Sequence, residues 1–291
     1  MKVVKNIKRV KEIIREEKRR GKLIGFVPTM GALHEGHLSL IRKCRKECDY
    51  VVVSIFVNPL QFGPSEDFDK YPRPVKKDLR LCRKENVDLV FLPSIKEMYP
   101  EKQLVFVDVE ELSKVLCGRF RPGHFRGVCT VVTKLFNITE PDISYFGQKD
   151  FQQAVIIKKM VKDLNMNTKI KVLPIVRDKD GLALSSRNTY LSSEERKQAV
   201  CLYKSLLLAK ELILKGERDA FKIKRKMKSF IEKNFDLAKI QYIEITDANN
   251  LKKIKKIEGK VLVALAVFIG TTRLIDNMLV HIRKDKIIFK L

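Results

Sequence analysis

The sequence lacks an apolar run that could cross a membrane as a helix. Its longest such run, residues 261–269, has the length of a strand, whereas a spanning helix needs about 20 apolar residues. Residues 1–20 alternate charged and apolar side chains and have no apolar centre of the kind found in signal peptides, so we expect an amphipathic helix there. We therefore expect no membrane partner and a cytoplasmic location.

Cysteine is sparse, and no pair has the C-x-x-C spacing. The six cysteines lie at positions 44, 48, 82, 117, 129 and 201, which argues against a zinc ribbon or a redox pair and fits a reducing cytoplasm. Cys44 and Cys48 are four residues apart on a predicted helix. We interpret both as small, buried or half-buried side chains.

Histidine is scarcer still, with four in the chain. Two of them form His34-Glu35-Gly36-His37, which is one residue shorter than the H-E-x-x-H motif of zinc enzymes. The spacing therefore argues against a zinc site, and we expect no metal ion held directly by protein side chains.

The chain is strongly basic, with a formal net charge of +25, but its sequence has no motif typical of nucleic-acid-binding proteins. The basic residues are spread along the chain and interleaved with Asp and Glu, without an arginine-rich arm, a zinc finger or an RNA-recognition motif. We expect no nucleic-acid partner. The same excess of positive charge is suited to attracting anionic small substrates.

Helical and extended patterns alternate over the first part of the chain. We predict helices at 5–20, 35–48, from 74 onward, 128–138 and 150–164, and strands at 22–27, 50–57, 88–92, 104–109, 143–146 and 170–176. Such alternation is typical of a parallel, doubly wound α/β sheet of the Rossmann-like kind. We assign it to a first domain, 1–178.

A different pattern follows residue 188. A helix start at Ser192–Glu195 leads into two lysine-rich helices that run to about residue 234, and strands are predicted at 240–246, 261–268 and 273–282. Neighbouring strands joined by short turns favour an antiparallel sheet. We therefore predict a smaller C-terminal α+β domain, 179–291.

The segment Gly25–Leu40, GFVPTMGALHEGHLSL, reads as a strand end, a tight turn and a helix start. Free amide groups and the positive end of the helix point at whatever lies above the sheet. His34 and His37 lie on one face of that helix end, and Gly36 leaves room for a ligand near the backbone. This arrangement is suited to a phosphate, although a histidine on a helix is also commonly solvated or a core donor.

Three more polar segments directly follow predicted strands. Asn58 and Gln61 flank a proline, and their amides can hold hydroxyl or carboxylate groups, although Asn58-Pro59 also makes a turn by itself. Lys149 is a candidate phosphate charge, and Asp150 is either a helix cap or a group near Mg²⁺. Residues 177–188 combine two serines and an arginine, which suit a pyrophosphate. Ligands of doubly wound sheets bind at such strand ends.

Taken together, these segments resemble the pantothenate synthetase (pantoate–β-alanine ligase) family of the nucleotidylyltransferase superfamily. The resemblance covers about residues 24–277 and rests on PTMGALHEGH, NPLQFGPSEDFDKYPR, RPGHFRGVCTVV, YFGQKDFQQ, DGLALSSRNTYLS and TTRLIDN, in this order. It implies a ligase that condenses (R)-pantoate with β-alanine, using ATP, through an enzyme-bound pantoyl adenylate. Pantothenate, AMP and pyrophosphate would be the products.

The resemblance also implies the cofactor, the partners and the site. ATP would be a substrate, Mg²⁺ would be bound through its phosphates, and the protein would be a homodimer. The catalytic groups would be His34 and His37, with His37 as a proton donor, together with Lys149, Ser185, Ser186 and Arg187. The nucleotide would contact Met30, Gly31, Ala32, Leu33, His34, Glu35, Gly36, His37, Gly147, Gln148, Lys149, Asp150, Val176, Leu184, Ser185, Ser186 and Arg187.

By the same resemblance, Gln61 and Gln153 would bind pantoate, Gln61 would also bind β-alanine, and Asn58 would belong to the substrate site. The methyl groups of pantoate would lie on Pro28, Met30, Val128, Val131 and Val132, although these valines could equally be ordinary core. Leu184 stands where many members carry methionine. The sequence assigns no role to the last nine residues, 283–291, or to Arg119, Arg121, His124 and Arg126, which either line the site or stabilise the Pro122-Gly123 turn.

Two rival functions stay open at this point. One is another nucleotidylyltransferase, such as a cofactor adenylyltransferase, which shares the H-x-G-H element but not the NPLQFG and GQKDFQQ segments. The other is a basic nucleic-acid binder without catalytic activity, which predicts binding to RNA or DNA that falls steeply with salt.

Overall fold

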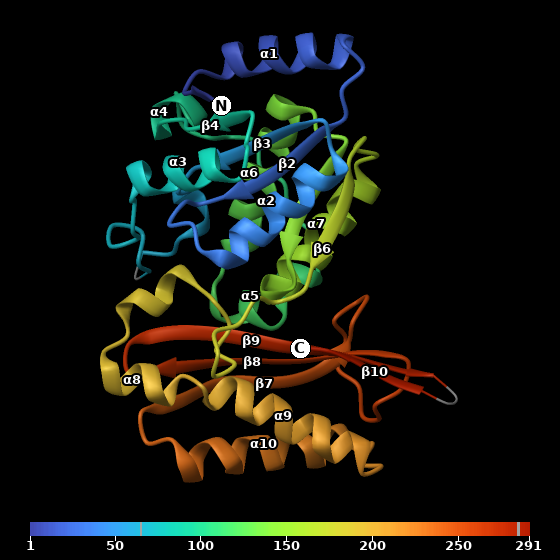
Figure 1. Ribbon diagram of the computed structural model, residues 1–291. Coiled ribbons are helices and arrows are strands. Elements are labelled where there is room, and N and C mark those ends of the chain that lie inside the picture. Colours follow the sequence, from blue (N-terminus) through green and yellow to red (C-terminus); the bar gives the residue numbers. More distant parts are fainter. Residues whose placement is uncertain (65, 284–285) are drawn as a thin grey trace. The chain divides into compact units, whose positions relative to one another are not determined.

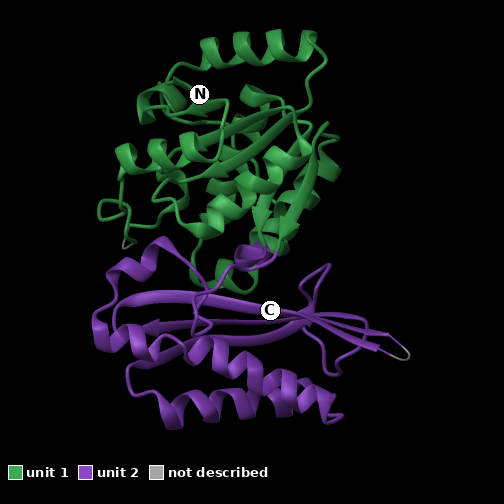
Figure 2. Cartoon of the chain, in the orientation of Figure 1, with its two compact units in different colours: residues 1–147, 153–173 green, residues 148–152, 174–291 purple. Residues whose placement is uncertain are grey.

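The computed structural model describes residues 1–64, 66–283 and 286–291 of the chain (Figure 1). Ser65 of the predicted 58–73 loop and Lys284 and Asp285 near the C-terminus therefore lie outside the described residues. The chain groups into two compact units: unit 1 comprises residues 1–147 and 153–173, and unit 2 comprises residues 148–152 and 174–291 (Figure 2). The assignment of domains to 1–178 and 179–291 stays a prediction.

Unit 1 contains a six-stranded sheet in which every pair of neighbouring strands is parallel. Its strand order is β1-β4-β3-β2-β5-β6. The strands are β1 (Lys2–Val4), β2 (Ile24–Thr29), β3 (Tyr50–Ile55), β4 (Leu89–Phe91), β5 (Ile143–Gly147) and β6 (Lys169–Leu173). The predicted doubly wound α/β sheet is confirmed.

Helices connect these strands. They are α1 (Ile7–Arg19), α2 (Glu35–Glu47), α3 (Val75–Lys84), α4 (Ile95–Met98), α5 (Cys117–Phe120), α6 (His124–Thr139) and α7 (Phe151–Asp163), with short 3-10 turns η1 (Pro59–Gln61) and η2 (Leu112–Lys114). The first two residues of α7 group with unit 2.

Alternation along β2 and β3 divides their side chains between two helical layers. Val27 and Val53 belong to a buried cluster that includes Ile41 and Cys44 of α2 and Cys82 of α3. On the opposite side, the ring of Phe26 packs edge-on against Phe136 of α6, with ring centroids 6.3 Å apart. Since successive strand residues point to opposite faces, both faces of the sheet are buried, as parallel sheets require.

The strand order indicates a candidate ligand site beyond the ends of β2 and β5. The chain runs outward from β2 through β3 to β4, and then returns to the other side of β2 to form β5 and β6. Ligands of doubly wound sheets bind at such a switch point, beyond the carboxyl ends of the strands. The segments that follow β2 and β3, and Gly147 at the end of β5, lie at this edge of the sheet.

The prediction of a strand at 104–109 is wrong. Residues 102–109 are irregular, and Leu104 and Val105 are 80% and 76% exposed. The backbone here bonds to a side chain instead of a strand, because the Val107 amide donates to the Thr130 hydroxyl on α6 at 3.0 Å. Conversely, β1 was not predicted; it is a three-residue edge strand that pairs with β4 ahead of the predicted helix.

Unit 2 combines helices with a four-stranded antiparallel sheet of order β10-β9-β8-β7. Its elements are η3 (Gln148–Asp150), η4 (Ser186–Tyr190), α8 (Ser193–Gln198), α9 (Cys201–Leu214), α10 (Ala220–Asn234), β7 (Ala238–Asp247), β8 (Lys260–Ile269), β9 (Thr272–Arg283) and β10 (Lys286–Lys290). The predicted C-terminal α+β arrangement is confirmed, with β10 added to the three expected strands.

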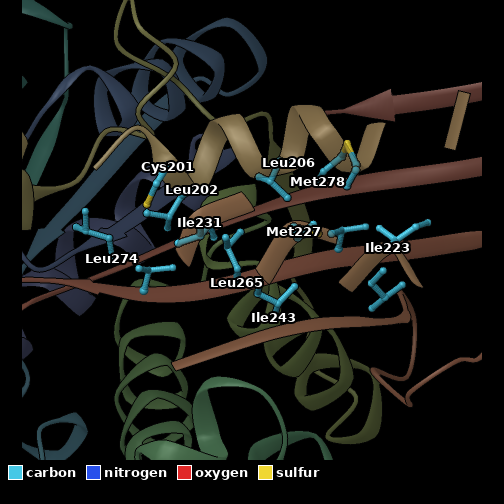
Figure 3. Close-up of a cluster of buried hydrophobic side chains, with 14 of the residues drawn as sticks. Cys201, Leu202, Leu206, Ile223, Met227, Ile231, Ile243, Leu265, Leu274 and Met278 are labelled. Atoms are coloured by element: carbon cyan, nitrogen blue, oxygen red, sulfur yellow. The ribbon is translucent and has the colours of Figure 1, made fainter. Parts of the chain in front are cut away.

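One face of this sheet packs against α9 and α10 (Figure 3). Leu202 and Leu206 of α9 and Ile223 of α10 share a buried cluster with Leu265 of β8 and Met278 of β9. Burial of apolar side chains on this scale supplies the main favourable free energy of folding for unit 2.

No helix in the described part of the chain is long and apolar enough to span a membrane. All six cysteines are buried and free of disulfide bonds, which confirms the interpretation of Cys44 and Cys48 as buried side chains.

Candidate functional site

The loop after β2 is shaped by backbone contacts. The Thr29 hydroxyl donates to the Ser54 carbonyl oxygen of β3 at 2.7 Å and accepts from the Gly31 amide at 3.1 Å. Gly31 and Ala32 both have positive φ, 82° and 50°. A non-glycine residue in this conformation is strained, so Ala32 needs contacts from elsewhere in the fold to hold it.

Asp78 of α3 supplies those contacts. Its Oδ2 accepts from the Ala32 amide at 2.9 Å, and its Oδ1 accepts from the Leu33 amide at 2.8 Å. The side chain is fully buried, and this burial raises the pKa of its carboxyl, although the two amides act in the opposite direction. Asp78 therefore anchors the predicted nucleotide loop from outside it.

His34 and His37 cap the start of α2. The Nδ1 atom of His34 accepts from the Gly36 amide at 3.2 Å, and the Nδ1 atom of His37 accepts from the His34 amide at 3.3 Å. Their ring centroids are 4.1 Å apart. A nitrogen that accepts carries no proton, so each neutral ring holds its proton on Nε2. A side chain at Gly36 would meet the His34 ring at 2.8 Å, which explains the glycine between the histidines.

A second group of polar side chains follows β3. Asn58 is 1% exposed and Gln61 is 9% exposed, and the Asn58 Nδ2 donates to the Gln61 Oε1 at 3.1 Å. The Gln61 Nε2 contacts the Met30 sulfur at 3.1 Å. The Tyr99 hydroxyl donates to the Asn58 Oδ1 at 2.7 Å. The structure thus brings together Met30, Asn58 and Gln61 within unit 1.

Gly127 lets α6 approach this group closely. A Cβ atom at Gly127 would meet the Leu60 carbonyl oxygen at 2.1 Å, so any side chain here would push η1 away. The close approach allows the Asn58 amide to donate to the Gly127 carbonyl oxygen at 3.1 Å. Val128, Val131 and Val132 lie in the same helix and are buried, in keeping with both interpretations that the sequence left open.

Glu66, Arg121 and His124 hold the Gln61 backbone. Arg121 donates to both Glu66 carboxylate oxygens at 2.6 Å and from Nη1 to the His124 Nε2 at 3.0 Å. The His124 Nδ1 donates to the Gln61 carbonyl oxygen at 2.8 Å. Two of the residues without an assigned role, Arg121 and His124, therefore position Gln61.

Arg126 and Arg119, the other two residues without an assigned role, lie over aromatic rings. Arg126 lies 4.0 Å from the Phe106 ring centroid, and Arg119 lies 5.7 Å from that of Phe120.

The Glu66–Arg121 pair predicts a pH-dependent stability. Burial is the largest single influence and opposes ionisation of Glu66. The hydrogen bonds and positive charge of Arg121, together with the Gly63 amide and His124, outweigh it and hold the pKa of this carboxyl below its usual 4.5. The stabilisation is therefore complete above pH 4.5 and is lost as the pH falls through the lower folded-state value. We expect Glu66→Gln to reduce the free energy of unfolding by about 1–3 kcal/mol at pH 7, and by progressively less below pH 4.5.

Denaturant unfolding of both proteins between pH 7 and pH 3 measures this difference. Glu101→Gln, at an exposed position of the same unit, is the matched control and should unfold like the parent at every pH. A difference for Glu66→Gln that stays constant down to pH 3 would contradict the assignment.

In unit 2, the segment after β5 presents Lys149 and Asp150. The Lys149 Nζ lies 3.8 Å from the Asp150 Oδ2, with 21% and 51% of the side chains exposed.

The Gln148 side chain is 3% exposed and donates to the Asn277 Oδ1 at 3.3 Å and to the Lys290 carbonyl oxygen at 3.0 Å. The last nine residues, for which the sequence indicated no role, thus include an acceptor for Gln148. Gln153, one turn of α7 further on, is half-buried and belongs to unit 1.

The predicted serine–arginine segment also lies in unit 2. Leu184 donates its amide to the Val176 carbonyl oxygen at 3.0 Å. Ser185 caps the start of η4, and its hydroxyl accepts from the Arg187 amide at 3.3 Å. Ser185, Ser186 and Arg187 are half-buried.

Residues that act across long sequence separations are not recognisable from the sequence. Asp78 lies 45 and 46 positions from the amides it binds, and its only local signal is an acidic residue in the first turn of a helix. Tyr99 likewise contacts Asn58 from 41 positions away. Among the described residues, His, Cys, Asp and Glu form no cluster of three or more that could hold a metal ion.

Comparisons with known proteins identify the family. The family model described as pantoate-beta-alanine ligase matches residues 2–279. A pantothenate synthetase of Fervidobacterium nodosum is 60% identical over 281 residues, which cover 97% of this chain and all of that relative. A crystal structure of pantothenate synthetase from Thermus thermophilus superposes with a TM-score of 0.90 at 40% identity, covering 95% of this chain and 98% of that one.

A crystal structure of pantoate-beta-alanine ligase from Francisella tularensis, complexed with beta-gamma ATP and beta-alanine, has a TM-score of 0.77 at 40% identity and covers 95% of this chain and 97% of that one. Each of these relatives matches over nearly its full length. The chain therefore belongs to the pantoate-beta-alanine ligase family.

Proposed function

We propose that this protein condenses pantoate with β-alanine, using ATP, and releases pantothenate, AMP and pyrophosphate. The observation that carries the proposal is the arrangement at the carboxyl edge of the unit 1 sheet. Two histidines with their protons on Nε2 follow β2, and the buried Asn58–Gln61 pair of amides follows β3. Hydrogen-bond donors for a phosphate thus accompany neutral amides for a polar organic acid.

In the first step, a carboxylate oxygen of pantoate attacks the α-phosphorus of ATP, and pyrophosphate leaves. Negative charge then spreads over the phosphate oxygens, so the enzyme must position two anions and supply donors and positive charge. We assign the Nε2 protons of His34 and His37 as donors and Lys149 and Arg187 as the fixed positive charges. Ser185 and Ser186 supply hydroxyl groups to the same phosphates.

Mg²⁺ accompanies ATP in this proposal. Because the described residues form no ligand cluster, we assign its binding to the ATP phosphates, with the half-exposed Asp150 carboxylate reaching it through water. Bound there, the ion neutralises phosphate charge.

In the second step, the neutral amine of β-alanine attacks the acyl carbon of pantoyl adenylate, AMP leaves with the bonding electrons, and the nitrogen releases a proton to solvent as the amide forms. The adenylate supplies the activated leaving group, so no covalent bond to the protein is needed. Water must be kept from this intermediate. We propose that the residues after 178 act as a lid domain and that the 58–73 loop contributes to the seal.

Pantoate is held by neutral groups in this account. Gln61 and Gln153 bind its polar groups, with Asn58 holding Gln61 in place, and its methyl groups contact Pro28, Met30, Val128, Val131 and Val132. The nucleotide contacts are the remaining residues of 30–37 and 147–150, together with Val176 and Leu184. We further propose a cytoplasmic homodimer.

Gln61→Ala tests the substrate assignment. It removes the amide that Asn58 orients, so we expect the KM values for pantoate and β-alanine to rise by about tenfold or more each, corresponding to about 1.4 kcal/mol of lost binding. Initial rates at saturating ATP measure both constants. Gln241→Ala, on β7 of unit 2, is the control and should leave them unchanged. Unaltered KM values in Gln61→Ala would remove the residue from the substrate site.

Product analysis tests the function itself. Incubation with ATP, Mg²⁺, pantoate and β-alanine should give AMP and pantothenate in equal amounts. A cofactor adenylyltransferase would instead form a dinucleotide and release only pyrophosphate. No turnover, together with RNA or DNA binding that falls steeply with salt, would replace the ligase with a nucleic-acid binder.

A further inference from the structure

Two consecutive buried polar residues of β9, Asp276 and Asn277, stand out in a strand that is otherwise largely apolar. Each is 3% exposed. Successive strand residues point to opposite faces of a sheet. Asp276 therefore shares its face with Leu274 and Met278 of the buried cluster beneath α9 and α10, and Asn277 points the other way. Burying two such groups is costly unless both are fully hydrogen-bonded.

Asn277 binds the segment that presents Lys149. Its Nδ2 donates to the carbonyl oxygens of Gln148 and Lys149, both at 3.0 Å, and its Oδ1 accepts from the Gln148 Nε2 at 3.3 Å. One side chain thus fixes the backbone of two residues of η3 and the side chain of the first. This bonding fits the grouping of residues 148–152 with unit 2.

Asp276 binds the segment that leads to Ser185 and Arg187. Its carboxylate forms a two-bond ion pair with Arg177, at 2.6 Å from Nη1 and 2.9 Å from Nη2. The Arg177 Nη1 also donates to the Gly181 carbonyl oxygen at 3.0 Å, and the guanidinium lies 4.7 Å from the Tyr203 ring centroid. The short turn 177–183 is closed by a bridge between Arg177 and Ala183.

The two anchors are linked, because the Asp276 Oδ1 also accepts from the Asn277 amide at 2.7 Å. We propose that Asp276 and Asn277 are positioning residues that hold two nucleotide-binding segments, 148–150 and 184–187, in their working conformation. This proposal rests on the function proposed above. It gives the TTRLIDN motif a role: the strand supplies a fixed base from which Lys149 and the Ser185–Arg187 segment reach the ATP phosphates.

A purely structural pair is the alternative, and it makes different predictions. A structural pair affects folding and leaves the kinetic constants of the folded enzyme unchanged. A positioning pair acts on ATP selectively, because the segments it holds are assigned to the nucleotide. Misplacement of binding groups by about 1 Å is enough to cost up to about 100-fold in rate.

The test uses the full-length protein and two near-isosteric substitutions. Asn277→Asp turns a donor into an acceptor facing two carbonyl oxygens, and Asp276→Asn removes the charge that Arg177 pairs with. We expect each to raise the KM for ATP by about tenfold or more, with a smaller change in the KM for pantoate. Hydrogen exchange should quicken at 148–150 in Asn277→Asp and at 177–187 in Asp276→Asn.

The control is Ile223→Ala in the unit 2 core. Ile223 is fully buried in α10, so the control lowers the melting temperature without removing a bond to either segment, and its KM for ATP should stay at the parent value. If Asn277→Asp does not fold, Asn277→Ser, which keeps one donor, is measured by the same criteria.

Unchanged KM for ATP and unchanged exchange in the folded variants would overturn the positioning role. Failure of the proposed function is distinguishable, because it would appear in the parent protein as an absence of pyrophosphate release from ATP and pantoate.

Discussion

Replacing His37 with alanine should slow pantoyl adenylate formation by about 10²–10³-fold, the usual cost of losing one donor to a developing charge. His37 is the third residue of α2, and its Nδ1 accepts a hydrogen bond from the His34 amide at 3.3 Å. The Nε2 proton is therefore fixed in direction before ATP binds. Single-turnover measurement of pyrophosphate release with saturating ATP and pantoate isolates this step.

A second substitution separates catalysis from helix capping. Alanine at position 37 also removes the acceptor for the His34 amide, so part of its effect is structural. Glutamine is favoured at this helix position because its side chain can accept that amide. His37→Gln should therefore keep the parent melting temperature and still lose most of the rate.

The matched control is the same change at an unrelated histidine. His281→Ala, near the end of β9, should release pyrophosphate at the parent rate. Parent-like single-turnover rates in both His37→Ala and His37→Gln would exclude His37 from the first chemical step.

Replacing Asp78 with alanine should lower both stability and activity. The substitution leaves the buried Leu33 amide and the neighbouring Ala32 amide without the acceptors they have at 2.8 and 2.9 Å. Each unsatisfied buried donor costs about 1–3 kcal/mol, so we expect the free energy of unfolding to fall by about 2–6 kcal/mol in total. The loop with positive φ at Gly31 and Ala32 then loses its anchor, and we expect the KM for ATP to rise.

Asp78→Asn should be intermediate, because the amide keeps the shape and one of the two acceptors. Asp163→Ala, which removes only an exposed ion pair with Lys159 on α7, should change stability by less than about 0.5 kcal/mol. Equal stability of Asp78→Ala and the parent protein in denaturant unfolding would refute the anchor.

The main lines of the fold are predictable from sequence because they follow from local periodicity. Buried parallel strands such as 50–55 are continuous apolar runs, and helices such as 35–47 show apolar residues at helical spacing. The exceptions have physical causes. Residues 104–109 are mostly apolar, like a buried strand, but in the described part of the chain they pair with no strand. β1 is a three-residue edge strand whose partner, β4, lies far along the chain, whereas β10 is a short edge strand that pairs with the adjacent β9.

The candidate site, like the fold, is predictable from the sequence only where local spacing determines it. Groups that act through sequence neighbours, such as the His34–His37 pair and the Asn58–Gln61 pair, are recognisable from their spacing, and the structure confirms that each pair is in contact. Groups that act across the chain are not recognisable, because Asp78, Arg121 and Asn277 serve segments 45 or more residues away. An isolated Asp, Arg or Asn carries no signal of such a partner.

We propose above all that this protein first activates pantoate as an adenylate and then transfers it to β-alanine. The most direct measurement is pyrophosphate release from ATP with pantoate alone, followed by addition of β-alanine. We expect a burst equal to the enzyme concentration with pantoate, and continuous release of AMP only after β-alanine is added. Pyrophosphate release that requires β-alanine from the start, or AMP release from pantoate and ATP without it, would contradict the two-step account.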